Sequence, residues 1–362
     1  MAVSDDTDRA THLVELLPQA SVDVLLVTDL LNVRYLTGFT GSSGLVLVGA
    51  DTRAFVTDFR YVERAADEVE GSFDRHRAPR ELLDLVEDLL PRGELRLGFE
   101  AANMSVRDHG RLREMLPTRV ELVPVDALVE RLREVKDGAE VARIRDASRV
   151  ADAAFRELLD EGLIGRTERD VAFALGEKIH RHGGDGPSFE TIVAAGAHGA
   201  LPHAAARDRE IKRGELVVID WGAELEGYHS DCTRTLAAGE PSPEAHEIYQ
   251  IVLDAQLAGL AATRAGAVGR SVDSAAREVI AAAGQGEHFG HSLGHGVGLA
   301  IHEGPRLSQR ADEALQSGNV VTVEPGIYLP ERFGVRIEDL VVVSADGSEI
   351  LTPITKELTT VE

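Results

Sequence analysis

The N-terminal third of the chain alternates short apolar runs with amphipathic segments. Strands are predicted for the apolar runs at residues 22–28, 45–49, 54–57 and 95–100. Helices are predicted where apolar residues recur at a spacing of three or four, at residues 61–69, 81–90 and 106–116. This alternation predicts an α/β domain that ends near residue 125.

A long amphipathic pattern follows the break at Lys136-Asp137-Gly138. One apolar stripe runs through it, formed by Val141, Ile144, Ala147, Ala151, Ala154 and Leu158. We therefore predict an N-terminal domain at residues 1–128, a linker at 129–138 and a C-terminal domain at 139–362.

The C-terminal domain repeats itself at an offset of 104 residues. "IGRTERDVA" from residue 164 matches "VGRSVDSAA" from residue 268, and "RGELVVIDWG" from residue 213 matches "SGNVVTVEPG" from residue 317. Two blocks with one common offset indicate a duplication. We predict two homologous halves, each built as helix, helix and sheet, which form one α+β domain.

Acidic residues interrupt apolar strands at corresponding places in the two halves. If the first hairpin is centred between residues 225 and 226, Asp220 and Asp231 face each other across it. Glu324 and Glu338 repeat the arrangement in the second half. The alternative is that the register differs and the acids are solvated residues at strand ends. A buried acid without a counter-charge is costly, so two such pairs favour one shared, inward-facing site.

Four clustered carboxylates require compensating positive charge, on the order of two divalent ions. The segment "HFGHSLGHGVGLAIHEG" at residues 288–304 offers four histidines among glycines, and these glycines argue against a helix. One imidazole added to four carboxylates suits Mn²⁺, Co²⁺, Fe²⁺ or Zn²⁺. A pair of such ions about 3.5–4 Å apart activates water for hydrolysis.

The ordered set of acids and histidine resembles that of the methionine aminopeptidase, prolidase and aminopeptidase P family, known as the pita-bread metallopeptidases (peptidase M24). "NVRYLTGFTGSSG" and "TDFRYVE" resemble the creatinase-like N-terminal domain of its proline-specific branch. "LPHA", "HSLGHGVGLAIHE", "VEPGIY" and "GVRIED" resemble that branch's catalytic motifs. The resemblance implies a creatinase-like α/β domain followed by a pita-bread domain with an internal pseudo-twofold duplication.

The resemblance also implies a role for each matching residue. The implied metal ligands are Asp220, Asp231, His295, Glu324 and Glu338. Glu324 would also move a proton from the bridging water to the leaving proline nitrogen. His203 would contact the scissile amide region, and His302 would stabilise the tetrahedral intermediate. His291 and Tyr328 would form the proline pocket, and Arg336 would position Asp231 or Glu338 or meet a substrate carboxylate. Structural alternatives are a helix cap for His203, a solvated loop for His302 and a charge pair for Arg336.

The implied function is a two-metal hydrolase that cleaves the bond before proline, with Mn²⁺ favoured and Co²⁺, Zn²⁺ or Fe²⁺ as alternatives. An aminopeptidase P-like enzyme that releases the N-terminal residue is our main hypothesis, and an Xaa-Pro dipeptidase (prolidase) is the alternative. A more distant alternative is a binding module without catalysis. Homodimerisation is expected from the resemblance alone.

Composition bears on the partners and the cellular location of the protein. With 62 acidic against 38 basic residues the net charge is −24, which disfavours nucleic acid and anionic membranes as partners. The polar start "MAVSDDTDRA" is unlike a secretory signal, and the single cysteine, Cys232, has no internal partner for a disulfide. We therefore expect a cytoplasmic enzyme.

Overall fold

The computed structural model describes residues 8–362. It divides into two compact units, with the boundary between Arg133 and Glu134. Residues 129–138, which we predict as a linker, include most of helix α6 (Leu128–Glu134) and the first residue of helix α7 (Gly138–Asp160). The chain therefore passes between the units largely as helix.

The N-terminal unit is an α/β domain, as the sequence predicts. Its six strands pair in the order β4-β3-β2-β1-β5-β6. The strands are β1 (Val24–Val27), β2 (Gly44–Gly49), β3 (Thr52–Thr57), β4 (Asp74–Arg77), β5 (Leu95–Glu100) and β6 (Val120–Val125). The helices are α1 (Arg9–Leu16), α2 (Leu30–Thr37), α3 (Val62–Glu68), α4 (Val86–Leu89) and α5 (Val106–Met115). Sequence patterning did not predict α1, α2, β4 or β6, and β4 contains no apolar residue that could mark it as a strand.

Helix α7 begins where the sequence predicts. Asp137 caps it by accepting a hydrogen bond from the backbone of Glu140, whose side chain accepts one from the backbone of Asp137 in return. Such a cap contributes about 1 kcal/mol. Most of the predicted apolar stripe is fully buried, so it faces the core of the C-terminal unit.

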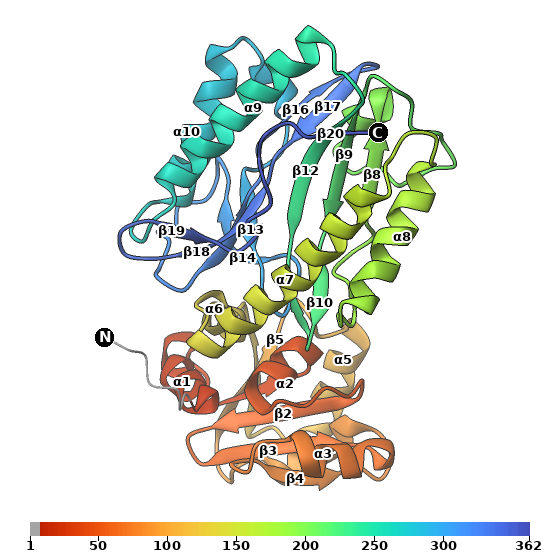
Figure 1. Ribbon diagram of the computed structural model, residues 1–362. Coiled ribbons are helices and arrows are strands. Elements are labelled where there is room, and N and C mark those ends of the chain that lie inside the picture. The colour runs from red at the N-terminus through yellow and green to blue at the C-terminus, as the bar shows by residue number, and fades with distance from the viewer. Residues whose placement is uncertain (1–7) are drawn as a thin grey trace. The chain divides into compact units, whose positions relative to one another are not determined.

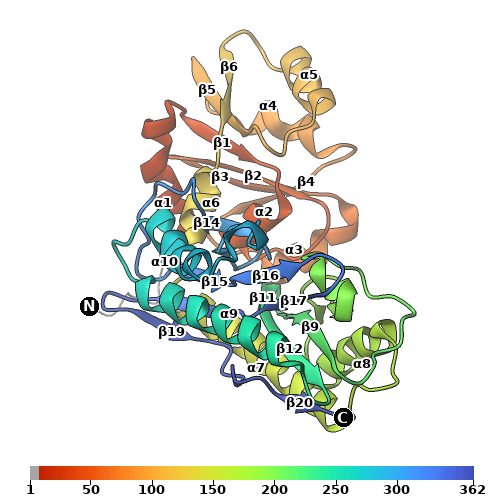
Figure 2. The ribbon, with the colours of Figure 1, turned by 90° about the horizontal axis from the view of Figure 1, so that it is seen from above.

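Two similar halves make up the C-terminal unit. In the first, α7 and α8 (Glu168–Arg181) pack on a sheet with the order β20-β12-β9-β8. In the second, α9 (Pro243–Ala262) and α10 (Gly269–Ala282) pack on a sheet with the order β14-β13-β15-β18-β19. The two helices of each pair lie side by side (Figures 1 and 2).

The strands of these sheets are short and mostly antiparallel. The first sheet contains β8 (Ile192–Ala195), β9 (Glu215–Trp221), β12 (Cys232–Ala238) and β20 (Thr360–Val361). The second contains β13 (Gly294–Gly296), β14 (Glu303–Leu307), β15 (Val320–Val323), β18 (Asp339–Val343) and β19 (Ser348–Ile350). None of the helices described within residues 8–362 is long and apolar enough to cross a bilayer.

A small ribbon interrupts the central strand pair of each half. In the first half, β10 (Ala223–Leu225) pairs with β11 (Tyr228–His229) and β7 (Gly186–Pro187). In the second half, β16 (Gly326–Leu329) pairs with β17 (Phe333–Arg336). Each ribbon separates a strand that ends near one acid from a strand that starts just after another, so the four acids gather at these breaks.

Candidate metal centre and active site

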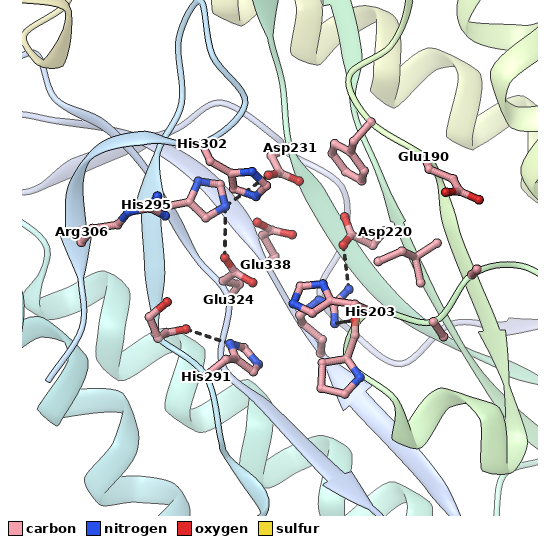
Figure 3. A pocket seen from close by; sticks show the side chains of 17 residues that line it. Glu190, His203, Asp220, Asp231, His291, His295, His302, Arg306, Glu324 and Glu338 are labelled. Atoms are coloured by element: carbon pink, nitrogen blue, oxygen red, sulfur yellow. Dashed lines mark hydrogen bonds and ion pairs between the residues drawn. The ribbon is translucent and has the colours of Figure 1, made fainter. Parts of the chain in front are cut away.

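A cavity of about 440 Å³ opens in the C-terminal unit where the two halves meet. Figure 3 shows carboxylate and imidazole side chains converging on it. Nearly all residues predicted for the site line it, namely His203, Asp220, Asp231, His291, His295, His302, Glu324, Arg336 and Glu338. Tyr328 is the exception among the predicted residues, since it is 7% exposed and does not line the cavity.

Asp220 and Asp231 reach the cavity in a different register from the one predicted. The hairpin turns at Glu226 and Gly227, which both have positive φ, rather than between residues 225 and 226. Asp220 therefore pairs with Thr233 across the sheet. Asp231 lies outside the strands, immediately before β12. The prediction that the two aspartates face each other was wrong, although both carboxylates still line one cavity.

Glu324 and Glu338 occupy equivalent positions in the second half. Glu324 immediately follows β15, and Glu338 lies between β17 and β18 rather than within one continuous strand. The backbone amide of Glu338 donates to the carbonyl of Thr233, so the second half is hydrogen-bonded to the first at the site. The hydroxyl of Thr233 also donates to Oε2 of Glu338 at 2.6 Å.

His295, from β13, presents Nε2 to acids of both halves. Nε2 lies 3.6 Å from Oδ2 of Asp231 and 3.4 Å from Oε1 of Glu324. The other ring nitrogen, Nδ1, lies 3.1 Å from the carbonyl of Gly296, which fixes the ring orientation. Nε2 is thus the nitrogen available to a ligand between these carboxylates.

Arg336 is hydrogen-bonded to Asp220, whereas the sequence predicted Asp231 or Glu338 as its partner. Its Nη2 donates to Oδ2 of Asp220 at 2.7 Å. Its Nη1 donates to the Tyr328 hydroxyl at 2.9 Å and to the carbonyl of Pro202 at 3.1 Å. The guanidinium reaches Asp220 because Thr233, opposite Asp220 on the sheet, receives its Nε–H at 3.0 Å.

The remaining histidines have different surroundings. His203 and His302 are exposed at the cavity, and the His302 ring lies 4.4 Å from the His295 ring between centroids. His291 is partly buried, with Nε2 3.0 Å from the Tyr328 hydroxyl. Tyr328 therefore reaches the site through His291 and Arg336.

Burial dominates the electrostatics of the site. It raises the pKa of Asp220, and together with repulsion from Glu338 it raises the pKa of Asp231 well above its usual range. Burial likewise raises the pKa of Glu338, with repulsion from Glu324, and raises the pKa of Glu324 to about 7. Burial also lowers the pKa of His295 to about 3. Each group thus disfavours its charged form in the protein alone.

This donor set fits divalent metal ions. Ligand atoms of Asp231, His295 and Glu338 lie within 4.8 Å of one another. Among the residues that the structure describes, the buried Oδ1 of Asp220 is an acceptor without a hydrogen-bond partner. A neutral imidazole and several carboxylate oxygens are ligands that borderline divalent ions prefer, and their positive charge would offset the repulsion between the acids.

Several lining or supporting residues escaped sequence analysis. Thr233 orients Glu338, and Thr322 donates to Oε1 of Glu324 at 3.0 Å while receiving the backbone N–H of His295. Arg306, four residues after His302, lines the cavity and is exposed. Thr322 lies two residues before Glu324, a spacing that puts both side chains on one face of a strand. This spacing would have been enough to predict the contact between Thr322 and Glu324.

The fold and the site together define a metal-dependent hydrolase. The model of metallopeptidase family M24 matches residues 142–345, and the model of the creatinase/prolidase N-terminal domain matches residues 9–135. The chain therefore belongs to metallopeptidase family M24, and it is a peptidase with a creatinase-like N-terminal domain and a pita-bread C-terminal domain.

Similar proteins, two of them of known structure, cover almost the whole chain. An Xaa-Pro dipeptidase from Bacillus anthracis has a TM-score of 0.94 and 39% identity, covering 98% of this chain and 99% of that one. An X-Pro aminopeptidase from Thermotoga maritima has a TM-score of 0.89 and 37% identity, covering 98% and 100%. A curated Xaa-Pro dipeptidase from Pyrococcus horikoshii is 36% identical, covering 97% and 98%.

Proposed function

We propose that this metallopeptidase is an Xaa-Pro dipeptidase, which hydrolyses the bond before proline in dipeptides. Our main hypothesis from the sequence is the aminopeptidase P-like activity, and the relatives support the dipeptidase alternative better. Two of the three similar proteins described above carry the name Xaa-Pro dipeptidase. The geometry of the cavity supports the same choice.

The metal centre is assigned to the five predicted ligands, Asp220, Asp231, His295, Glu324 and Glu338. We propose two divalent ions, with Mn²⁺ first and Co²⁺, Zn²⁺ or Fe²⁺ as alternatives. Bound ions of this kind polarise a scissile carbonyl and make water a nucleophile at neutral pH. The chain's own task is to hold these side chains in place, which Thr233, Thr322 and Arg336 do through the hydrogen bonds described above.

Proton transfer is assigned to Glu324. This carboxylate lines the cavity with Oε1 3.4 Å from Nε2 of His295, where it can take a proton from water and give it to the departing proline nitrogen. His203 and His302 are exposed at the same cavity, where their ring nitrogens can donate hydrogen bonds to the substrate amide.

An apolar wall suits the proline ring. It is formed by Phe189, Ile192, Pro202, Ala204 and Ala205, which all come from the first half. His291 adjoins the cavity with its ring held by Tyr328. Burial lowers the pKa of His291 to about 4, so at neutral pH the ring is uncharged and compatible with an apolar pocket.

The position of Arg306 is the main reason for proposing dipeptides rather than longer peptides as substrates. It is an exposed cation lining a cavity ringed by acids, and within residues 8–362 it has no carboxylate partner at salt-bridge distance. An Xaa-Pro dipeptide carries a free carboxylate on the proline, whereas a longer peptide has an amide there. A charge-assisted hydrogen bond to Arg306 would therefore favour the dipeptide by about 1.5–3 kcal/mol.

The test compares Ala-Pro, Ala-Pro-amide and Ala-Pro-Ala with metal-stripped protein, with and without Mn²⁺. We expect cleavage only with metal and most efficiently for Ala-Pro. Arg306→Gln should raise KM for Ala-Pro about 10- to 100-fold and leave Ala-Pro-amide unchanged. Arg310→Gln, an exposed residue on the same segment, is the matched control.

Other results would change the proposal in defined ways. Equal cleavage of Ala-Pro-Ala would return the aminopeptidase hypothesis, and no cleavage despite bound metal would favour the binding module. Homodimerisation and a cytoplasmic location stay predictions, to be checked by sedimentation and by cell fractionation.

A further inference from the structure

Each half of the C-terminal unit contains a fully buried acid on its second helix, far along the sequence from the proposed ligands. Glu168 lies in the first turn of α8 and Asp273 in the second turn of α10, and both are 0% exposed. The two positions are 105 residues apart, close to the offset of the internal repeat. Neither lines the cavity, so the reaction itself does not explain their burial.

Glu168 holds both ends of the loop at residues 196–206, which carries His203. Its Oε1 accepts the backbone N–H of Ala195 at 2.9 Å, where β8 ends. Its Oε2 accepts the backbone N–H of Arg207 at 3.2 Å, and Nδ1 of His198 lies 2.8 Å from the same oxygen. One carboxylate thus fixes the entry, the exit and an interior residue of this loop.

Asp273 does the same for the segment at residues 289–293, which carries His291. Its Oδ1 accepts the backbone N–H of Leu293 at 3.1 Å, and both of its oxygens accept from Arg277 at 2.8 Å. Arg277 in turn donates to the carbonyls of Phe289 and His291, each at 2.8 Å. The acid and the arginine together hold the segment at three backbone positions.

We propose that Glu168 and Asp273 are positioning residues that fix the two histidine-bearing segments against the cavity. A desolvated carboxylate that accepts several N–H groups is a strong anchor, and removing it leaves buried donors unpaired. The histidines they position are placed on substrate by the proposed function, so the catalytic part of this inference rests on that proposal. The anchoring part does not depend on it.

The first experiment measures hydrogen exchange by mass spectrometry. Glu168→Gln replaces one of the two acceptor oxygens with an NH2 group that cannot accept, so exchange at residues 195–207, which include the two backbone N–H groups bonded to Glu168, should rise at least about tenfold. Asp273→Asn should raise exchange at residues 289–293 by a similar factor. Glu177→Gln on α8 and Glu278→Gln on α10, both outside these anchoring contacts, are matched controls. Unchanged exchange in the named segments would overturn the anchoring.

The second experiment is a double-mutant cycle with His203→Ala, using Ala-Pro and Mn²⁺. Glu168→Gln and His203→Ala should each lower kcat/KM by about 10- to 100-fold, and the double variant should be no worse than His203→Ala. Metal affinity should stay unchanged. Additive losses would overturn the positioning role, because a general structural defect does not act through His203.

These outcomes separate this inference from the proposed function. If the wild-type enzyme fails to cleave Ala-Pro while exchange still rises in the variants, the proposed function is wrong and the anchors stand. If Glu168→Gln does not fold, Glu168→Asp replaces it, since the shorter side chain keeps the charge and reaches fewer of the three donors. If Glu168→Asp had the same kcat/KM and the same hydrogen exchange as the wild type, the proposal would be overturned.

Discussion

The two halves of the C-terminal unit share a scaffold but contribute different chemistry to the cavity. Each supplies two acids at the break between its central strands. The first half alone supplies the apolar wall, whereas the second supplies three of the four lining imidazoles, His291, His295 and His302, together with Arg306. The comparison teaches that both halves kept their two acids after the duplication, whereas the residues around the acids diverged. As a result, the first half presents an apolar surface to the cavity and the second half presents polar groups.

The strand beside the first acid of each half illustrates this divergence. In the first sheet Ile192 of β8 pairs with Asp220 of β9. In the second sheet the neighbour of β15 is β13, which lies between β14 and β15 and carries His295, whose backbone N–H donates to the hydroxyl of Thr322. The strand beside the acid-bearing strand thus supplies a cavity-lining aliphatic side chain in one half and a proposed metal ligand in the other.

The largest expected effect comes from removing one acid of either half. Asp231→Asn and Glu338→Gln should each lower kcat/KM for Ala-Pro by more than about 100-fold, since even outer partners of metal ligands are worth about 10- to 100-fold. Both should weaken Mn²⁺ binding in titration calorimetry. A variant of one half that retained wild-type metal affinity would show that the halves do not share the ions.

The threonines that orient the acids should have the next largest effect. Thr233→Val removes the hydroxyl bonded to Glu338, and Thr322→Val removes the one bonded to Glu324. We expect a loss of about 10- to 100-fold in kcat/KM from each, with similar values for the two halves. Thr235→Val is the control. Thr235 also lies on β12, but its hydroxyl is bonded to the backbone of Arg336, so its removal leaves the hydrogen bonds of the acids intact. Losses below about twofold would contradict the assignment.

Changing the apolar wall should affect binding more than turnover. Ile192→Ala should raise KM for Ala-Pro about tenfold, because lost methylene contacts in an apolar pocket are worth about 1–3 kcal/mol. Mn²⁺ affinity should not change. Ile350→Ala, an exposed residue of the second half, is the control. A fall in kcat with constant KM would mean that this wall does not bind the proline ring.

The smallest expected effect is on stability against pH in the metal-free protein. The pKa of Glu324 is raised to about 7 by burial, so the folded state binds a proton that the unfolded state has released above about 4.5. The resulting stabilisation is complete below about pH 4.5 and is lost as the pH rises through about 7. The midpoint of thermal unfolding should therefore fall by a few degrees, roughly 2–4 °C per kcal/mol, between about pH 5 and pH 8.

Two additions sharpen this measurement. Mn²⁺ should remove most of the fall in unfolding temperature, because bound cations offset the carboxylates. Asp152→Asn reports a contribution from outside the site, since burial raises the pKa of Asp152 to about 7 as well. A fall in unfolding temperature that persists with Mn²⁺ and disappears in Asp152→Asn would assign the pH dependence to Asp152.

The four acids of the site could be predicted from the sequence because they stand at corresponding places in the two halves, whereas the roles of the surrounding histidines, Tyr328 and Arg336 rest on the family resemblance. The internal offset links Asp220 with Glu324 along the chain, and both line one cavity. The hairpin register could not be predicted, since it depends on the positive φ that Glu226 adopts beside Gly227. The partner of Arg336 was missed for a related reason, because its contact with Asp220 spans 116 residues and leaves no local trace.

The single tryptophan, Trp221, follows Asp220 directly and is fully buried in the first half. Its ring stacks on Phe155 with centroids 3.9 Å apart, and its indole N–H donates to the carbonyl of Ala151. All ultraviolet emission from tryptophan in this protein therefore originates beside one proposed ligand. Intrinsic fluorescence can therefore follow ion loading and the unfolding of the first half without any introduced label. The second half contains no tryptophan and contributes no such signal.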